Sequence, residues 1–163
     1  MEATMVGVIE ARTWEDLYLR LRPTLMRALA ATSGSYEGVE DAIQDAFAAA
    51  MERDASDIRS PEAWLFVVAN NRLRRSRRFD RLKRRLGMQA PRSEEDLDQA
   101  LLRLEVTRKL LTLSPRDREL LVAKYYVGMT QEEIARFLKV PRGTVSAAVS
   151  RAAARYRGLE EER

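Results

Sequence analysis

The sequence contains no cysteine and no histidine among its 163 residues. Disulfides, cysteine nucleophiles, histidine general bases and zinc sites built from the usual ligands are therefore excluded. A site made of carboxylates alone would need paired acids in an apolar setting, and no such pair stands out. We therefore expect neither catalytic residues nor a bound metal or cofactor, and we look for a function that consists of binding.

Long apolar runs are also lacking. No stretch approaches the roughly 20 residues that a membrane-spanning helix needs. Residues 1–12 lack the basic start and apolar core of a signal peptide. No segment alternates in the manner of a strand, and no internal repeat is visible. The sequence thus predicts an all-helical cytosolic protein that has no membrane partner.

Charge is plentiful but unevenly distributed. The formal net charge is +4, and acidic residues outnumber basic ones up to Arg59. The stretch from Arg72 to Arg85 holds nine basic residues and a single acid, Asp80. A basic excess gathered in one segment favours an acidic partner such as nucleic acid.

The helix signals fall into two groups separated by a linker. We expect the first group to begin at a Thr13 cap, to continue with a helix over about residues 37–52, and to end with a helix opened by Ser60 and Pro61. Residues 87–93 (GMQAPRS) have a glycine, a proline and no periodicity, as is typical of a linker. Further helices are predicted after Ser93 and Ser114. The predicted domains are residues 13–86 and 97–158, joined by a flexible linker at 87–96.

The last group ends in a helix-turn-helix pattern. Thr130 and Glu133 have the spacing of a capping box, and Lys139-Val140-Pro141 ends that helix. In the helix that follows, Val145 and Val149 share the apolar face with Ala152, whereas the opposite face is small, polar or basic: Thr144, Ala147, Ser150, Arg151 and Ala154. Such a slim second helix fits a DNA major groove. A helical hairpin that serves only as core is the alternative.

The helix at about 37–52 has one acidic side. Asp41 and Asp45 lie four residues apart, where like charges cost roughly 0.2–0.5 kcal/mol. The helix dipole explains acids in the first turn without any function, but Asp45 lies beyond that turn. A solvated face and a docking face for a basic partner both remain open.

The helix after Ser60 joins an apolar start to a basic end. Asn70 and Asn71, two poor helix formers, stand between these parts. So many cations on one helix repel one another unless anions neutralise them, which favours contact with phosphates over a solvated basic face. Trp64, near the start, is more typical of a core residue than of a platform for base stacking.

Three blocks, in order, resemble an extracytoplasmic-function (ECF) sigma factor of bacterial RNA polymerase. Residues 39–50 (VEDAIQDAFAAA) are similar to the segment of the family that docks on the core polymerase. Residues 60–78 (SPEAWLFVVANNRLRRSRR) are similar to its promoter-melting helix, and residues 113–157 resemble its helix-turn-helix domain. The resemblance implies a promoter-specificity subunit whose partners are core polymerase and promoter DNA, with an anti-sigma protein as a common further partner. The polymerase would supply the chemistry.

The resemblance also implies roles for the matching positions. The polymerase-docking surface would comprise Glu40, Asp41, Gln44, Asp45 and Phe47, although we expect Phe47 to point mostly into the core. The minus-ten element, as duplex and melted strand, would meet Asp54, Ser56, Arg59, Ser60, Asn70, Asn71, Arg74, Arg75 and Arg78. The minus-thirty-five element would meet Thr130, Arg142, Gly143, Thr144, Ser146, Ala147, Ser150 and Arg151.

Four positions depart from the pattern of the family. Ser146, Ala147 and Ala148 stand where basic or larger polar residues are frequent, so we expect few base contacts and more reliance on DNA shape or water. Lys139 stands where the turn often has glycine. The rival interpretation is a stand-alone helix-turn-helix regulator of the response-regulator output type, which explains neither the acidic face nor the Asn-Asn-arginine helix. A helical scaffold for protein partners leaves the arginines unexplained.

Overall fold

The computed structural model describes residues 11–53, 58–88 and 105–161, and within these ranges every regular element is helical. The N-terminal group comprises α1 (Ala11–Ser33), α2 (Val39–Met51) and α3 (Pro61–Arg85). The C-terminal group comprises α5 (Glu105–Thr112), α6 (Pro115–Leu121), the π-helical segment η2 (Val122–Val127), α7 (Gln131–Leu138) and α8 (Arg142–Glu161). The predicted helix after Ser93 and most of the predicted linker lie outside the described residues. The prediction of an all-helical fold is confirmed.

The first three helices pack around an apolar core. Leu29, Ile43 and Leu65 contribute one side chain from each helix, and all three are fully buried. The helix α1 begins at Ala11, so the prediction of Thr13 as its cap is wrong. Ala11 and Arg12 are good helix formers, and they extend the helix ahead of the threonine.

The helix α2 starts later than its pattern predicted. Gly38 has a φ of 74°, in the left-handed region, so the helix begins at Val39 rather than near Glu37. At the other end, Met51 is 58% exposed. It is the last residue of the helix, where the core contacts have already ended.

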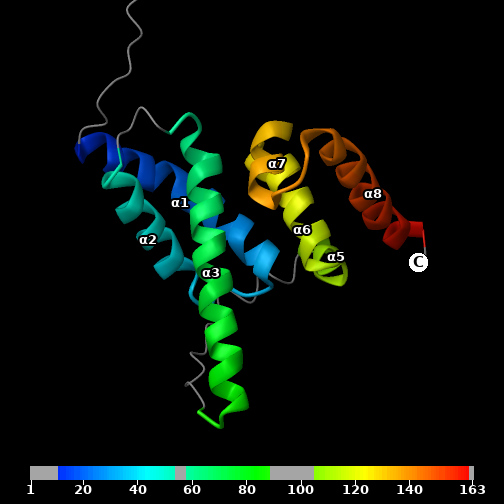
Figure 1. Ribbon diagram of the computed structural model, residues 1–163, viewed down its shortest axis with the longest axis horizontal. Helices are drawn as coiled ribbons and strands as arrows, with labels where there is room; N and C mark the ends of the chain where they lie inside the picture. The colour runs from blue at the N-terminus through cyan, green and yellow to red at the C-terminus, as the bar shows by residue number, and fades with distance from the viewer. Residues whose placement is uncertain (1–10, 54–57, 89–104, 162–163) are drawn as a thin grey trace, which may run out of the picture.

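The start of α3 is confirmed: the Ser60 hydroxyl accepts a hydrogen bond from the Ala63 amide, and Pro61 is the first helical residue. Trp64 is partly buried against the core. The second half of α3 extends beyond the other described helices (Figure 1). Arg77 is an exception among its cations, because it is half-buried and donates to the carbonyl oxygens of Ser33 (2.6 Å) and Ser35 (3.3 Å). These two hydrogen bonds join α3 to the end of α1. Burial lowers the pKa of the Arg77 guanidinium.

The C-terminal helices follow their caps closely. Ser114 caps α6 by accepting from the Asp117 amide, and Thr130 and Glu133 form the predicted capping box reciprocally. Lys139 ends α7 in the left-handed conformation with a φ of 55°. The Asp117 carboxylate receives two hydrogen bonds from the Arg155 guanidinium (2.8 and 3.0 Å), which ties α6 to α8.

The two groups of helices lie side by side in Figure 1, with α1 against α5, α6 and η2, and α3 against η2. Gly34, just after α1, marks one close approach: a Cβ there would lie 3.0 Å from a methyl group of Leu111, and its φ is 82°. Within the described ranges no helix is long and apolar enough to cross a membrane.

Candidate DNA and polymerase interfaces

The helix α8 presents the candidate reading face. Val145, Val149 and Ala152 are buried, as the periodicity predicted. The opposite face is exposed, and its side chains are short apart from that of Arg151. Short side chains let a helix backbone come close to base edges in a major groove. Six of the predicted contact residues lie on the exposed part of α8: Gly143, Thr144, Ser146, Ala147, Ser150 and Arg151.

Thr130 and Arg142, which complete the predicted minus-thirty-five set, already have partners. Thr130 is exposed, but its hydroxyl and its amide both serve the capping box with Glu133. Arg142 donates to Glu132 at 3.1 Å, and both side chains are largely exposed. An exposed ion pair is worth about 0–1 kcal/mol, so this contact leaves Arg142 available to a phosphate.

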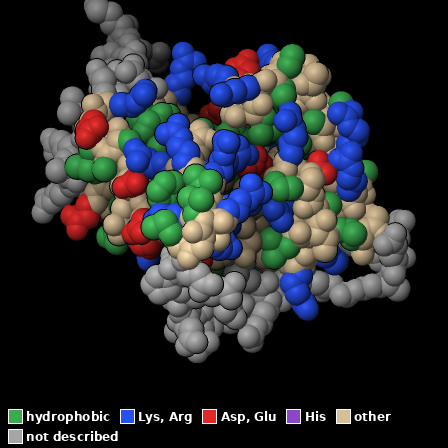
Figure 2. All heavy atoms as spheres, turned by 60° about the horizontal axis from the view of Figure 1, so that its bottom comes forward, with side chains coloured by type: hydrophobic (Ala, Val, Ile, Leu, Met, Phe, Trp, Pro, Cys, Tyr) green, Lys and Arg blue, Asp and Glu red, His purple; other side chains and the backbone are tan. Residues whose placement is uncertain are grey.

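The helix α3 divides the predicted minus-ten residues between two faces. Asn71, Arg75 and Arg78 are exposed on one side, and Arg59 is exposed just before the helix. Ser60 is occupied as the cap. The view of Figure 2 shows Lys and Arg side chains gathered across this part of the surface, with the acidic side chains mainly towards one edge. The two remaining predicted residues, Asp54 and Ser56, lie outside the described residues.

Asn70 and Arg74, by contrast, face the C-terminal helices. The Asn70 side chain is only 2% exposed, and its Nδ2 donates to Glu119 Oε1 of α6 at 3.3 Å. Glu119 also pairs with Arg74 and is itself almost fully buried. Of the two asparagines predicted to meet the minus-ten element, only Asn71 is accessible in this arrangement, because neighbouring residues on a helix point about 100° apart.

An aromatic contact continues the same junction. The Phe137 ring of α7 packs edge-on against Phe66 of α3, with centroids 5.8 Å apart. The Arg74 guanidinium lies over the Phe137 ring at 5.9 Å. Phe66, Asn70 and Arg74 are spaced four apart, so they form a single stripe along α3. No sequence pattern indicated that Glu119 and Phe137 would contact this stripe, because the two sides are about 50 to 70 residues apart in the chain.

The predicted polymerase-docking residues on α2 also divide. Asp41, Gln44 and Asp45 are exposed. Phe47 is buried, and its ring packs edge-on against Trp14 and Tyr18. The prediction that Phe47 points into the core is confirmed. Phe47 supports the surface from beneath rather than forming part of it.

Glu40 is held within the protein. Its carboxylate accepts hydrogen bonds from the Arg22 guanidinium, with Nε at 3.0 Å, and from the Tyr18 hydroxyl. The bond from Arg22 holds the pKa of Glu40 below its usual value, despite partial burial. Burial is the main reason that the pKa of Tyr18 is raised, and the hydrogen bond to Glu40 adds to it. The carboxylate thus joins α1 to α2 and is only partly available to a partner.

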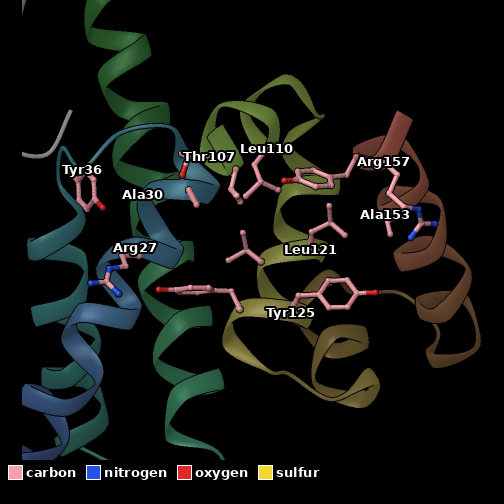
Figure 3. Close-up of a pocket in the computed structure, with 14 residues that line it drawn as sticks. Arg27, Ala30, Tyr36, Thr107, Leu110, Leu121, Tyr125, Ala153 and Arg157 are labelled. Carbon is pink, nitrogen blue, oxygen red and sulfur yellow. The ribbon is translucent and has the colours of Figure 1, made fainter. Parts of the chain in front are cut away.

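A cavity of about 810 Å³ lies between α1 and the C-terminal helices. Figure 3 shows its aliphatic side chains, such as Leu110 and Leu121, facing the open space together with tyrosine rings. Arg27 and Arg157 lie at opposite sides, on α1 and α8. The cavity is thus an apolar hollow with a cation at each side.

Comparison with known families accounts for both helical groups. Residues 17–83 match the model described as Sigma-70 region 2, and residues 103–155 match Sigma-70, region 4. The RNA polymerase sigma factor CnrH of Cupriavidus metallidurans is 32% identical over 138 residues, which cover 74% of this chain and 72% of CnrH. The chain belongs to the ECF group of the sigma-70 family. As a sigma factor it is a promoter-specificity subunit of RNA polymerase, within a family of non-catalytic initiation factors.

Other relatives support the same family assignment. The ECF RNA polymerase sigma factor SigL of Mycobacterium tuberculosis is 29% identical, with 83% of this chain and 82% of SigL covered. The solved structure of CnrH in complex with the cytosolic domain of CnrY has a TM-score of 0.66 and 27% identity, covering 93% of this chain and 89% of that one. The fold of RpoE, solved with the anti-sigma factor NepR from Bartonella quintana, is also similar (TM-score 0.68, 22% identity, 93% and 98% covered). The interpretation as a stand-alone regulator is not favoured.

Proposed function

We propose that this sigma factor uses three separate surfaces in turn. The acidic face of α2 binds core polymerase, the exposed face of α3 holds the opened minus-ten element, and α8 reads the minus-thirty-five element. The first two surfaces belong to a domain at about residues 13–86, and the third belongs to a domain at about residues 97–158. The polymerase performs the chemistry, and the protein acts in the cytoplasm. The observation that carries the proposal is the second half of α3, a projecting helix whose exposed side chains are mostly arginine.

The role of α3 rests on the chemistry of melted DNA. Unstacked bases expose their hydrogen-bonding edges, and an asparagine amide offers both a donor and an acceptor. Asn71 is exposed on the helix, one turn before Arg75 and two turns before Arg78. The arginines would follow the phosphates, which supplies affinity without sequence preference, while Asn71 would contact a base.

The role of α2 rests on exposed acids. Asp41 and Asp45 stand on the same face with Gln44 between them, and all three side chains are accessible. A basic surface on the polymerase would convert their mutual repulsion into binding energy. Glu40 and Phe47 contribute by fixing α2 against α1.

The cavity between the domains would receive an anti-sigma protein. We assign to it an amphipathic helix of such a protein, with an apolar stripe flanked by acidic residues. The apolar lining suits the stripe, and Arg27 and Arg157 at the two sides suit the acids. The solved complex of CnrH with a domain of another protein is in keeping with such a partner.

Run-off transcription with purified core polymerase tests the central proposal. We expect transcripts that start at a cognate promoter only when the wild-type protein is added. Asn71→Ala should reduce strand opening, followed by permanganate reactivity of unpaired thymines, more than it reduces binding to duplex promoter DNA. Ser76→Ala, an exposed change on the same helix, is the matched control and should leave both unchanged. If strand opening in Asn71→Ala stays at the wild-type level, the proposal that Asn71 contacts an unpaired base is wrong.

A further inference from the structure

One stripe of α3 is blocked by the protein itself. Phe66 and Asn70 are buried against Phe137 of α7 and Glu119 of α6, and the half-exposed Arg74 guanidinium contacts the same two side chains. The adjacent face with Asn71, Arg75 and Arg78 is exposed. Asn70 is nearly inaccessible. The promoter-melting helix is therefore half covered by the domain that carries the reading helix.

The covering groups have the chemistry of a nucleotide. A carboxylate, Glu119, accepts from the Asn70 amide and pairs with the Arg74 guanidinium, as a base acceptor or a phosphate does. A flat ring, that of Phe137, lies beneath the same guanidinium and against Phe66, as a stacked base does. Anion and ring come from two different helices of the C-terminal domain.

We propose that Glu119 and Phe137 form an internal nucleotide mimic that keeps the free sigma factor closed. The proposal rests on the proposed minus-ten role of α3 and extends it from the exposed face with Asn71 to Asn70 and Arg74, which the family resemblance also places at this element. A DNA strand and the mimic need the same atoms of Asn70 and Arg74, so they exclude each other. The closed protein binds single-stranded minus-ten DNA weakly, and separation of the C-terminal domain from α3 frees the site.

The energetic balance permits such a switch. A buried carboxylate is tolerable only while its partners remain, and Glu119, with only 4% of its side chain exposed, has Asn70 and Arg74 of this junction as partners. When the domains separate, Glu119, Asn70 and Arg74 all regain water, which makes the contact reversible. The junction combines these polar contacts with the Phe66–Phe137 ring contact, and α1 also packs against α5, α6 and η2, so separation of the domains must break both sets of contacts.

The test compares two variants with the same change in net charge. Glu119→Gln keeps the shape of the side chain but removes the charge that pairs with Arg74. Glu15→Gln, an exposed change on α1, is the matched control, because any added positive charge raises DNA affinity. Binding of each full-length variant to a fluorescent single-stranded minus-ten oligonucleotide is measured at one salt concentration. We expect Glu119→Gln to bind at least about 5-fold more tightly than Glu15→Gln, the lower end of usual coupling between sites.

A distance measurement follows the opening directly. The chain has no cysteine, so Leu19→Cys on α1 and Ala154→Cys on α8, both exposed, give two unique positions for fluorescent labels. The distance between the labels should lengthen in Glu119→Gln and should remain at the wild-type value in Glu15→Gln. Equal DNA affinity in the two variants together with an unchanged label distance would overturn the closed-state proposal.

Transcription separates this proposal from the function on which it rests. In one outcome, wild-type protein directs promoter-dependent transcription, but Glu119→Gln and Glu15→Gln have the same affinity for single-stranded DNA and the same label distance. The internal mimic is then wrong and the sigma function stands. If the labels separate in Glu119→Gln but single-stranded DNA does not bind more tightly, the junction holds the domains together without competing for DNA. That outcome would also overturn the mimic.

Discussion

The Arg72 guanidinium of α3 lies 3.3 Å from the Asp45 carboxylate of α2. This ion pair joins the helix proposed to meet DNA to the face proposed to meet polymerase. Both side chains are more than 40% exposed, so the pair is worth at most about 1 kcal/mol. Asp45 therefore has one cation nearby, and the repulsion from Asp41 is partly relieved within the protein.

Reversal of Asp45 to lysine should sharply weaken association with core polymerase, because opposite charges across the interface become like charges. The variant should also lose up to about 1 kcal/mol of stability, since it replaces the pair with Arg72 by a repulsion. Asp41→Lys, on the same exposed face, should also weaken association, and any loss of stability in that variant comes from the helix dipole rather than from the pair with Arg72. Affinity for core polymerase and thermal melting separate the two effects. Wild-type affinity in both folded variants would reject the docking face.

Arg151→Ala should weaken binding of the full-length protein to duplex DNA that carries the minus-thirty-five element. Loss of one good base contact costs roughly 1–3 kcal/mol. Thermal melting should be unaffected, because Arg151 is exposed on α8. Val149→Asp, which buries an unpaired charge on the opposite face, should instead unfold the C-terminal domain. Unchanged affinity in Arg151→Ala would remove this arginine from the reading face.

Lys139→Gly should stabilise the protein. Lys139 has a φ of 55° and a ψ of 45°, a conformation that costs an ordinary residue roughly 1–2 kcal/mol. Glycine removes that cost but adds about 0.5–1 kcal/mol of chain entropy, so a gain of about 0.5–1 kcal/mol remains. Urea unfolding measures it. Arg136→Gly, inside α7, is the control and should lose roughly 1 kcal/mol. Equal losses in the two variants would show that the turn does not need this conformation.

Glu40→Gln should lower stability in a manner that depends on pH. The Arg22 hydrogen bond lowers the pKa of Glu40 in the folded protein, so this group stabilises the fold above its unfolded value of about 4.5. The contribution is lost as the pH falls through the depressed folded pKa. The difference in melting temperature between wild type and variant should thus be constant near pH 7 and shrink below about pH 4.5. Asp41→Asn, without these partners in α1, is the control, and a difference that persists at low pH would reject the linkage.

Most of the local structure of this protein is encoded in short stretches of its sequence. The Thr130–Glu133 capping box, the Ser60 and Ser114 caps and the alternation of buried and exposed residues on α8 all depend on neighbours within four residues. Short-range hydrogen bonds and the helical repeat set these features before any domain packing. The prediction failed at Thr13, where the helix propensity of Ala11 and Arg12 outweighed the capping signal and the helix extends upstream of the predicted cap.

Tertiary structure alone decided which exposed residues are free to bind. Asn70 and Asn71 are adjacent and chemically identical, yet one contacts Glu119, 49 residues away in the chain, and the other faces solvent. Glu40 and Asp41 divide in the same way, because Arg22 and Tyr18 of α1 reach only the first of them. A helical pattern states which residues share a face, but the element that covers that face comes from distant parts of the chain. Only the packed protein determines which faces remain open to a partner.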